Sequence, residues 1–411
     1  MHRPGTLPRP RSPLHDGTLF QPRRPAFWAF VAIVVAATFV MFDEQSVLRG
    51  ISPIGWTLSW GLLALYATPI LLLVYTLDLY EREPLSLVFG ALLWGAVAAT
   101  TLAGFANDGW GLVVARVGGP EFAARWTAAL TAPFVEEILK GCGVVLIYLI
   151  APDEIDDMMD GFVYGAVCGL GFTVVEDVFY FMGVFGGHPA GVLQGFFVRV
   201  IASGLYSHVL YTGLVGMGIG YFVSRRDHRP LGRRIMVVGG LAAAAVIGHF
   251  LWNSPFLDLF PGRPWTGADW LMIPVATGVK GLPLLGCVGL AVVLARRRER
   301  AWLRGALASE IGAAGISVGE LAILERPPRR REAVRTMRRR AGPRAGALLR
   351  RLQREQVNLA MIRSKVAAAD DPALVEQRAY CGSLRDALRA MPGAAPADAG
   401  DPAADMSPGG G

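Results

Sequence analysis

Residues 131–140 read Thr-Ala-Pro-Phe-Val-Glu-Glu-Ile-Leu-Lys and lie in a run that is otherwise apolar enough to span a membrane. A charge at bilayer depth costs roughly 2.5–3.5 kcal/mol to insert, so it is usually retained for a function or a buried partner. Lys140 follows Glu136 by four residues and Glu137 by three, so on a helix it reaches either carboxylate along one face. The stretch predicts a membrane helix that carries a buried charged group.

The composition of the chain is that of a polytopic membrane protein. Of its 411 residues, 53% are hydrophobic and 18% are charged, which is too apolar for a soluble protein of this length. The net charge of +7 comes largely from arginines in the C-terminal part. The four cysteines form no C-x-x-C pair, so the sequence indicates neither a disulfide framework nor a cysteine zinc site.

Eight apolar segments are long enough to cross about 30 Å of hydrocarbon. We therefore predict an all-α fold, a polytopic transmembrane bundle of about eight spans with a C-terminal cytoplasmic helical tail. The first segment is expected to be a retained helix, since no A-x-A-like cleavage site follows it soon. The short apolar stretch 110–117 is expected to lie at the interface. The predicted spans are 26–43, 56–76, 86–106, 127–151, 161–184, 199–223, 235–253 and 272–295.

The predicted domain organisation has four parts. Residues 1–25 form a disordered basic tail, 26–295 the membrane domain, 296–391 a cytoplasmic Arg-rich helical region, and 392–411 a disordered tail rich in Ala, Pro, Asp and Gly. In the helical region, apolar residues recur at helical spacing over 344–366. Asp371 followed by Pro372 is typical of a helix N-terminus. A second stripe follows, so we expect a helical hairpin whose stripes serve packing; this stripe comprises Leu374, Cys381, Leu384 and Leu388.

Arginine placement predicts the orientation. Arginines gather in the N-terminal tail, in the loop 224–234 and directly after the last span, at 296–300. With eight spans and the N-terminus inside, all three clusters lie on the cytoplasmic face, as the positive-inside rule requires. Loops near 105–125, 187–198 and 254–270 then face outward. The predicted localisation is a cell membrane, the inner membrane of a bacterium, with both termini cytoplasmic.

The Arg-rich run between 326 and 354 raises the question of nucleic-acid binding. No aromatic interleaving or base-reading motif accompanies it, and it is tethered to a membrane. We therefore expect no nucleic acid as a partner and predict attraction to anionic lipid headgroups.

Further polar residues interrupt three other spans: Glu176 and Asp177, then His208, then His249 with Asn253 four residues later. With a rise of about 1.5 Å per residue, Glu136 and His208 lie roughly 14 Å below the outer surface and Glu176 about 12 Å. His249 is shallower, at roughly 6 to 10 Å by the same rise. The eight-span topology thus predicts one polar layer shared by several helices.

The chemistry that such a layer supports is hydrolysis. A buried glutamate beside a second carboxylate suits proton transfer to and from water, and histidines can orient water, stabilise an oxyanion or bind a metal. Two histidines and a glutamate could ligate zinc, with another glutamate as general base. No H-E-x-x-H motif is present, so glutamate-dependent and metal-dependent mechanisms both stay open. A buried ion pair that braces the bundle, a proton-coupled transporter and a non-catalytic membrane scaffold are the alternatives.

In order along the chain, Glu136-Glu137-x-x-Lys140, Phe172-x-x-x-Glu176, His208 and His249-x-x-x-Asn253 resemble the motifs of PrsW-type intramembrane proteases. That family is related to the CAAX prenyl endopeptidases and bacteriocin-immunity-like membrane proteins. The stretches 78–84 and 160–165 also look family-like, and the resemblance covers roughly residues 55 to 255. The wider superfamily often has histidine in the second motif and arginine in the first, so Glu176 and Lys140 favour the PrsW branch.

The resemblance implies an endopeptidase that cuts a membrane-anchored substrate such as an anti-sigma factor. By analogy, Glu136 and Glu137 activate water, with Glu136 favoured as the base, and Glu176 completes the site. His208 and His249, with Asn253, polarise the scissile carbonyl or hold a metal such as zinc. The metal candidates are then Glu176, His208 and His249, and the supporting residues are Lys140, Phe172 and Asn253.

Overall fold

The computed structural model describes residues 17–77, 83–202, 208–226, 229–255, 267–312, 316–366 and 368–393. Within these ranges the protein is built of helices, and its only β pairing is an isolated bridge between Ile311 and Ile316. The predicted all-α class is therefore confirmed. The predicted disorder of 1–25 and 392–411 falls largely on residues 1–16 and 394–411, outside the described part, as does most of the 78–84 motif.

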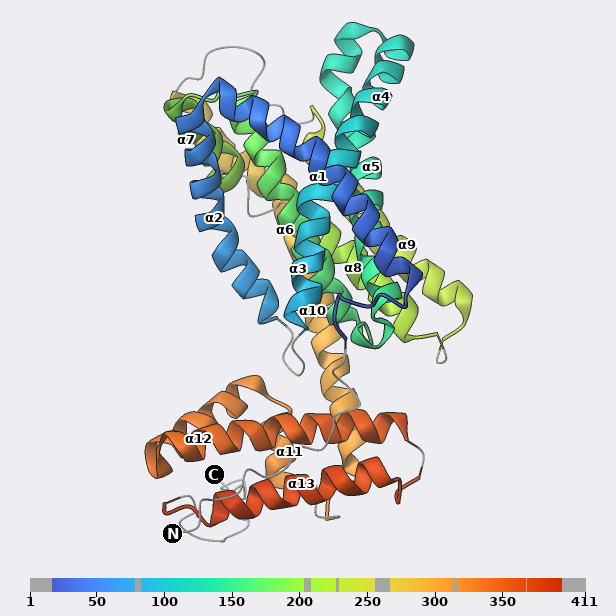
Figure 1. The fold of residues 1–411 in the computed structure, drawn as a ribbon, viewed down its shortest axis with the longest axis vertical. Helices are drawn as coiled ribbons and strands as arrows, with labels where there is room; N and C mark the ends of the chain where they lie inside the picture. The colour runs from blue at the N-terminus through green and yellow to red at the C-terminus, as the bar shows by residue number, and fades with distance from the viewer. Residues whose placement is uncertain are drawn as a thin grey trace, which may run out of the picture. The chain divides into compact units, whose positions relative to one another are not determined.

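The chain forms two compact units, the first comprising Leu14–Val292 and the second beginning at Val293. Long helices run lengthwise through the first unit (Figure 1). Its elements are α1 (Pro25–Ile51), α2 (Pro53–Tyr75), α3 (Leu85–Leu93), the π-helical turn η1 (Trp94–Ala99), α4 (Thr100–Gly118), α5 (Pro120–Ile150), η2 (Pro152–Glu154), α6 (Met158–Met182), α7 (Pro189–Phe196), the π-helical turn η3 (Phe197–Ala202), α8 (His208–Ser224), α9 (Leu231–Asn253) and α10 (Gly267–Ala308), which continues into the second unit.

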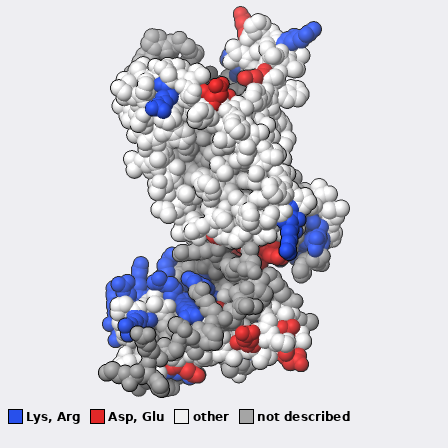
Figure 2. Space-filling model, in the orientation of Figure 1, with Lys and Arg blue, Asp and Glu red and all other residues white. Residues whose placement is uncertain are grey.

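Five helices in the described residues are long and apolar enough to cross a membrane: α1, α2, α6, α9 and the continuous run Leu85–Gly118. They coincide with five of the eight predicted spans. Of the other three, α5 carries Glu136, Glu137 and Lys140 near its middle, and α8 has 17 described residues. Spans beyond these five stay a prediction. Figure 2 shows a broad uncharged band on the visible face of this unit, with charged side chains towards its two ends.

The structure corrects the expectation for the segment after the third span. An outward loop near 105–125, with a short interfacial piece at 110–117, was expected. Instead, the helix continues through η1 and α4 to Gly118, and α5 begins at Pro120. Because glycine tolerates a positive φ, Gly119 at φ 84° makes the turn between the two helices.

Helix α6 is the centre of the first unit, and its residues from Met159 to Thr173 are buried without a break. It crosses α8 at backbone contact. A Cβ added at Gly165 would lie 2.2 Å from the carbonyl oxygen of Thr212, and one at Gly169 would lie 2.2 Å from that of His208. Glycine at such crossings lets membrane helices approach closely. The start of α8, where His208 stands, is therefore held against α6.

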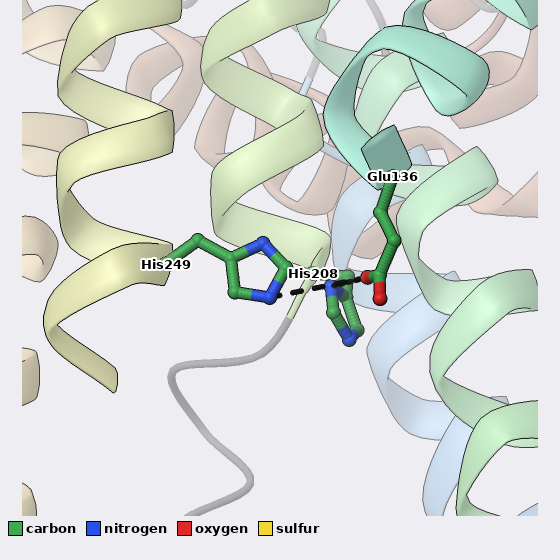
Figure 3. A group of neighbouring side chains, drawn as sticks. All are labelled: Glu136, His208 and His249. Carbon is green, nitrogen blue, oxygen red and sulfur yellow. Dashed lines mark ion pairs between the residues drawn. The ribbon is translucent and has the colours of Figure 1, made fainter. Parts of the chain in front are cut away.

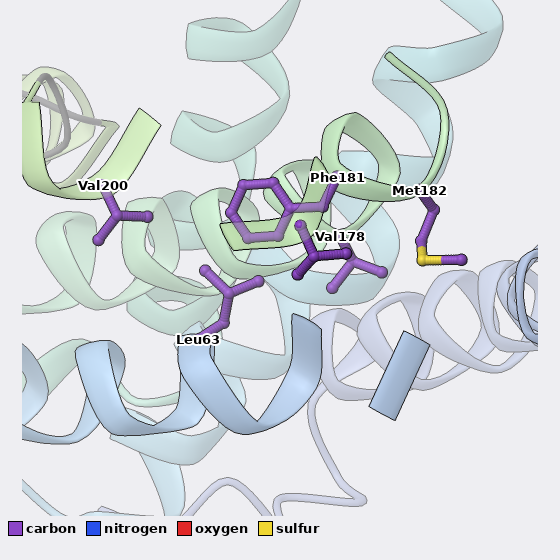
Figure 4. Packing of buried hydrophobic residues seen from close by; sticks show 6 residues of the cluster. Leu63, Val178, Phe181, Met182 and Val200 are labelled. Carbon is purple, nitrogen blue, oxygen red and sulfur yellow. The ribbon is translucent and has the colours of Figure 1, made fainter. Parts of the chain in front are cut away.

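A hydrophobic cluster holds the other end of α6 (Figure 4). It joins α2 and α6 to α7 and η3, and all its members are at most 3% exposed. Between membrane helices such packing stabilises the fold through close van der Waals contact. The cluster fixes η3 beside the C-terminal half of α6, which matters for the site below. Its residues are Leu63, Val178, Phe181, Met182, Val192 and Val200.

The second unit contains α11 (Val318–Leu324), α12 (Pro327–Lys365) and α13 (Pro372–Arg389). The predicted helical hairpin is confirmed, since apolar residues of α12 and α13 form one buried cluster. Asp371 caps α13, and its side chain accepts a hydrogen bond from the Ala373 amide at 2.9 Å. All four residues of the predicted second stripe are buried. Helix α12 bends at Gly342, whose φ is 87°.

Candidate functional site

Helix α5 brings three charged side chains into the interior of the bundle. Glu136 is 3% exposed, Glu137 is 2% exposed and Lys140 is fully buried. Lys140 Nζ lies 2.7 Å from Glu137 Oε1 and 3.6 Å from Glu136 Oε2. The i, i+3 and i, i+4 spacing read from the sequence therefore produces the contacts that it predicts.

Helix α8 contributes His208, whose two ring nitrogens have different partners. Nδ1 lies 2.8 Å from Lys140 Nζ, and Nε2 lies 3.1 Å from Glu176 Oε2 on α6. The ring of Phe172 packs edge-on against the imidazole at 4.9 Å and lies 4.3 Å from Lys140 Nζ. Phe172 thus separates this part of the site from the rest of α6 and makes a cation–π contact with the ammonium.

Helix α9 contributes His249, which is 2% exposed. Its Nδ1 lies 3.1 Å from Glu137 Oε1, and its Nε2 lies 3.9 Å from Glu136 Oε2. The ring stacks on Tyr211 with centroids 4.8 Å apart, and its centroid is 4.9 Å from that of His208. Two imidazoles from different helices therefore meet beside the pair of glutamates.

Glu136 and Glu137 differ in how fully their oxygens are used. Glu137 Oε1 contacts Lys140 and His249, and its Oε2 accepts a hydrogen bond from Thr212 at 2.9 Å. Glu136 Oε1 accepts from Asn107 Nδ2 at 3.2 Å, but Glu136 Oε2 is buried with no hydrogen-bond partner among the described residues. A buried acceptor without a partner is costly. Glu136 Oε2 is therefore the oxygen that is available for a ligand or for water.

The side chains of Glu136, His208 and His249 point toward one another (Figure 3). His208 Nδ1 lies 3.8 Å and His249 Nε2 lies 3.9 Å from Glu136 Oε2, and the ligand atoms of the three residues all lie within 4.8 Å of one another. A carboxylate and two imidazoles are a donor set typical of hydrolytic zinc sites. The ammonium of Lys140 lies against two of these groups, with its Nζ 2.8 Å from His208 Nδ1 and 3.6 Å from Glu136 Oε2.

The carboxylate of this three-residue group differs from the one expected. The sequence-derived metal candidates were Glu176, His208 and His249, but Glu176 contacts His208 through Nε2, on the side of the ring away from the nitrogen that faces Glu136. Glu176 contacts only the Nε2 side of His208, whereas Glu136 lies near one nitrogen of each histidine. Asn253 lies outside the group, and its Nδ2 donates to the carbonyl of Ala128 at 3.3 Å.

Sequence reasoning missed three side chains that contact the site: Asn107, Thr212 and Arg199. Arg199, in η3, donates from Nη2 to Glu176 Oε2 at 2.8 Å and from Nε to Asp177 Oδ1 at 2.5 Å. An arginine inside a predicted span is the same signal that singled out Glu136, and it could have identified Arg199. Asn107 and Thr212 are neutral and gave no such signal.

Comparison with known proteins gives a consistent result. Residues 83–279 match the family described as PrsW family intramembrane metalloprotease. A protein named Protease PrsW from Geobacillus kaustophilus (strain HTA426) is 28% identical over 202 residues, covering 48% of this chain and 72% of that protein. A protein of the same name from Bacillus subtilis (strain 168) is 31% identical over 109 residues, which are 26% of this chain and 47% of that protein. No solved structure matches the chain.

Proposed function

Because this chain belongs to the PrsW family of intramembrane proteases, we propose that Glu136, His208 and His249 form its hydrolytic centre and that Glu136 acts on the attacking water. The chain is a membrane-embedded protease, and the assignment of residues to the chemistry is our proposal. One observation carries it. Glu136 Oε2 is buried without a hydrogen-bond partner among the described residues and faces one nitrogen of each histidine.

We assign the two glutamates different roles because only Glu136 has an oxygen without a hydrogen-bond partner among the described residues. Glu137 accepts from Thr212 and contacts Lys140 and His249, so we assign it to orientation of the site. A carboxylate only accepts, so His249 donates its Nδ1–H to Glu137, and the lone pair of its Nε2 faces Glu136. Glu137 therefore determines which nitrogen His249 offers to the centre.

Peptide hydrolysis follows from a water held by these acceptors. The water donates hydrogen bonds to Glu136 Oε2 and to a histidine lone pair, and its oxygen attacks the scissile carbonyl carbon. Glu136 takes the proton that the water loses and returns it to the amide nitrogen as the C–N bond breaks. General acid–base catalysis of this kind contributes about 10²–10⁴-fold in rate.

The same three residues fit a divalent metal ion. Glu136 Oε2, His208 Nδ1 and His249 Nε2 would hold it, since these atoms converge on one region and Glu136 Oε2 is an orphaned buried oxygen. Lys140 Nζ, which lies 2.8 Å from His208 Nδ1, would have to move away from that nitrogen. A bound ion such as zinc would supply activation of water and polarisation of the scissile carbonyl. Glu176 and Glu137 stand on the opposite nitrogens of the two histidines, as the carboxylates behind metal-ligating histidines commonly do.

The test compares Glu136→Gln with wild type in cells that express a panel of single-pass membrane proteins, including anti-sigma factors, the substrate class that we propose. New protein N-termini are identified by mass spectrometry. We expect cleavage products in wild type that disappear in Glu136→Gln and persist in Glu121→Gln, a control at an exposed position of the same helix. Cleavage at the wild-type rate in Glu136→Gln would contradict the proposed role.

Metal analysis of the purified protein separates the two mechanisms. We expect about one divalent ion per chain in wild type and a much lower content in His249→Ala, with activity lost in chelator and restored by zinc. Full activity in metal-free protein would instead assign Glu136 as a base on water alone.

We also propose that both termini are cytoplasmic. The arginines at the α8–α9 connection and at the end of α10 support this orientation under the positive-inside rule. Single cysteines placed at Arg226 and at Gly119 in a chain without its four native cysteines would test it. A membrane-impermeant maleimide should reach position 119 in intact cells and position 226 only after lysis.

For the Arg-rich tail we propose anionic lipid headgroups as the partner. The face of α12 away from its buried residues carries exposed arginines, which Figure 2 shows as a cluster of positive charge on the second unit. Each basic residue near an anionic surface contributes about 1 kcal/mol. In proteoliposomes, phosphatidylglycerol should slow tryptic cleavage of α12 relative to phosphatidylcholine, and salt should reverse the protection. Equal cleavage in both lipids, or protection by added nucleic acid alone, would overturn this proposal. The exposed arginines are Arg329, Arg331, Arg335, Arg338, Arg339, Arg340, Arg344, Arg350 and Arg354.

A further inference from the structure

Arg199 is a charged side chain that lies within the apolar first unit and contacts none of the three residues of the proposed centre. Its guanidinium spans two neighbouring carboxylates of α6, with Nη2 2.8 Å from Glu176 Oε2 and Nε 2.5 Å from Asp177 Oδ1. Its Cζ also lies 3.6 Å from the centroid of the Tyr180 ring. The guanidinium thus contacts two carboxylates and one aromatic ring.

Arg199 and His208 contact the same oxygen of Glu176. Glu176 Oε2 lies 2.8 Å from Arg199 Nη2 and 3.1 Å from His208 Nε2. Because a carboxylate oxygen only accepts, His208 must carry its proton on Nε2. The lone pair of a neutral His208 is then on Nδ1, the nitrogen that lies 2.8 Å from Lys140 Nζ and 3.8 Å from Glu136 Oε2.

We infer that Arg199 is a positioning residue of the hydrolytic centre: through Glu176 it fixes the Nε2–H tautomer and the ring orientation of His208. This inference rests on the proposed function, in which the Nδ1 lone pair of His208 faces the water or the ion. Without the guanidinium, the carboxylate of Glu176 loses the contact that holds its oxygen toward the imidazole. Either nitrogen of His208 can then carry the proton.

The local fold explains how an arginine reaches this place. Arg199 lies in η3, a π-helical turn, and such turns are frequent at functional sites because the extra residue per turn re-aims side chains. The next residue, Val200, belongs to the buried cluster with Val178 and Phe181. This packing anchors η3 against α6, so the guanidinium is presented to the carboxylates of that helix.

The first measurement reads the tautomer and does not depend on activity. Nitrogen NMR of the full chain, labelled at its six histidines and assigned with His208→Asn, distinguishes Nδ1–H from Nε2–H. We expect the Nε2–H form of His208 in wild type, a mixture of the two in Arg199→Gln, and a partial return to Nε2–H in Arg199→Lys. An unchanged tautomer in Arg199→Gln would overturn the inference and leave the proposed function untouched.

The matched control is Arg234→Gln. Arg234 is buried and Arg199 half-buried, and Arg234 Nε donates to the carbonyl of Phe222 at 2.7 Å, away from the site. The control should leave the tautomer and kcat unchanged, whereas Arg199→Gln should lower kcat about 10–100-fold with little change in KM, as loss of a partner behind a ligating histidine does. Equal losses of kcat in both variants would reduce Arg199 to a purely structural role.

A double-mutant cycle tests the route through Glu176. If Arg199 acts through that carboxylate, Arg199→Gln lowers kcat in the wild-type background and has no further effect in Glu176→Gln. Additive losses would overturn the inference. If Arg199→Gln fails to fold, Arg199→Lys replaces it in the cycle, because lysine keeps the charge and loses the two-pronged geometry. The expected result is that changing Arg199 mixes the tautomers and lowers kcat in the wild-type background, and changes neither one further once Glu176 is Gln.

Discussion

Two regions of this protein pair acidic with basic side chains, but they differ in whether every carboxylate oxygen has a hydrogen-bond donor. In the second unit, Arg378 contacts both oxygens of Glu310, Arg385 both oxygens of Glu320, and Arg304 both oxygens of Glu325. Every carboxylate oxygen in these pairs has a donor. In the first unit, four carboxylates share Lys140 and Arg199, and two of their oxygens, Glu136 Oε2 and Asp177 Oδ2, have no hydrogen-bond partner in the described part of the chain.

The difference separates structural pairs from a reactive group. A two-pronged arginine–carboxylate pair satisfies both partners and adds geometric specificity, so nothing is left over for a ligand. A buried cluster that has more acceptors than donors favours the binding of a proton or a cation. Completeness of pairing, rather than burial, therefore distinguishes the proposed hydrolytic centre from these three arginine–glutamate pairs.

The largest expected effect comes from Glu137→Gln, which removes the negative charge that pairs with Lys140 and His249. Breaking a buried ion pair leaves Lys140 without its closest partner and costs about 3–5 kcal/mol. We expect a lower midpoint of thermal unfolding in detergent together with loss of cleavage. Glu136 Oε2 has no hydrogen-bond partner among the described residues and lies 3.6 Å from Lys140 Nζ, so Glu136→Gln should lose cleavage with a smaller drop in stability. An equal drop in stability in both variants would contradict the distinction between the two glutamates.

The next effect concerns the crossing of α6 and α8. In Gly169→Ala, the added Cβ would lie 2.2 Å from the carbonyl of His208, so α8 must shift and carry the imidazole with it. A displacement of about 1 Å at a reacting group can cost about 10²-fold in rate. The matched control is Gly239→Ala on α9, where a Cβ meets nothing within 4 Å. Cleavage assays should separate the two, and similar rates would argue against a rigid crossing.

A smaller effect is expected in the C-terminal unit, where the pairs are complete. Glu310 is fully buried, and Glu310→Gln removes a charge-assisted pair with Arg378, which costs about 2 kcal/mol. Hydrogen exchange of α13 should become faster while the rate of substrate cleavage stays at the wild-type value. A matching loss of cleavage would show that the C-terminal pairs also serve the hydrolytic centre.

The smallest effect is expected at the exposed pair. Arg304 has a side chain that is 69% exposed, so water replaces its contacts with Glu325 when it is changed to Ala. Exposed ion pairs contribute little to stability. Neither the unfolding midpoint nor cleavage should change measurably in Arg304→Ala, and a clear loss in either would mean that exposure is a poor guide to the weight of these pairs.

The sequence predicted the helical class and the residues of the polar layer because both depend on composition along the chain. Acids and histidines inside apolar runs identify themselves, and Glu136, His208 and His249 do meet in the structure. The helical hairpin of the second unit was equally readable, since apolar spacing and the Asp371 cap are local signals.

What the sequence could not give is the direction in which each side chain points. Glu136 and Glu176 are both buried-span acids, and only the rotation of α5 and α6 puts one beside both histidines and the other behind His208. Arg199 reaches the site from η3, and Asn107 reaches it from α4, beyond the predicted end of the third span. The roles of all these residues stay predictions until the variants above are measured.

The backbone contact between α6 and α8 has a consequence for protein engineering. Because glycines rather than large side chains determine that spacing, the relative position of the two helices does not depend on the lipid-facing residues of either. Lipid-facing positions of both helices can therefore be varied while Gly165 and Gly169 are kept, and the start of α8 should stay against α6. Any library of this protein that is meant to preserve the placement of His208 should hold those two glycines constant.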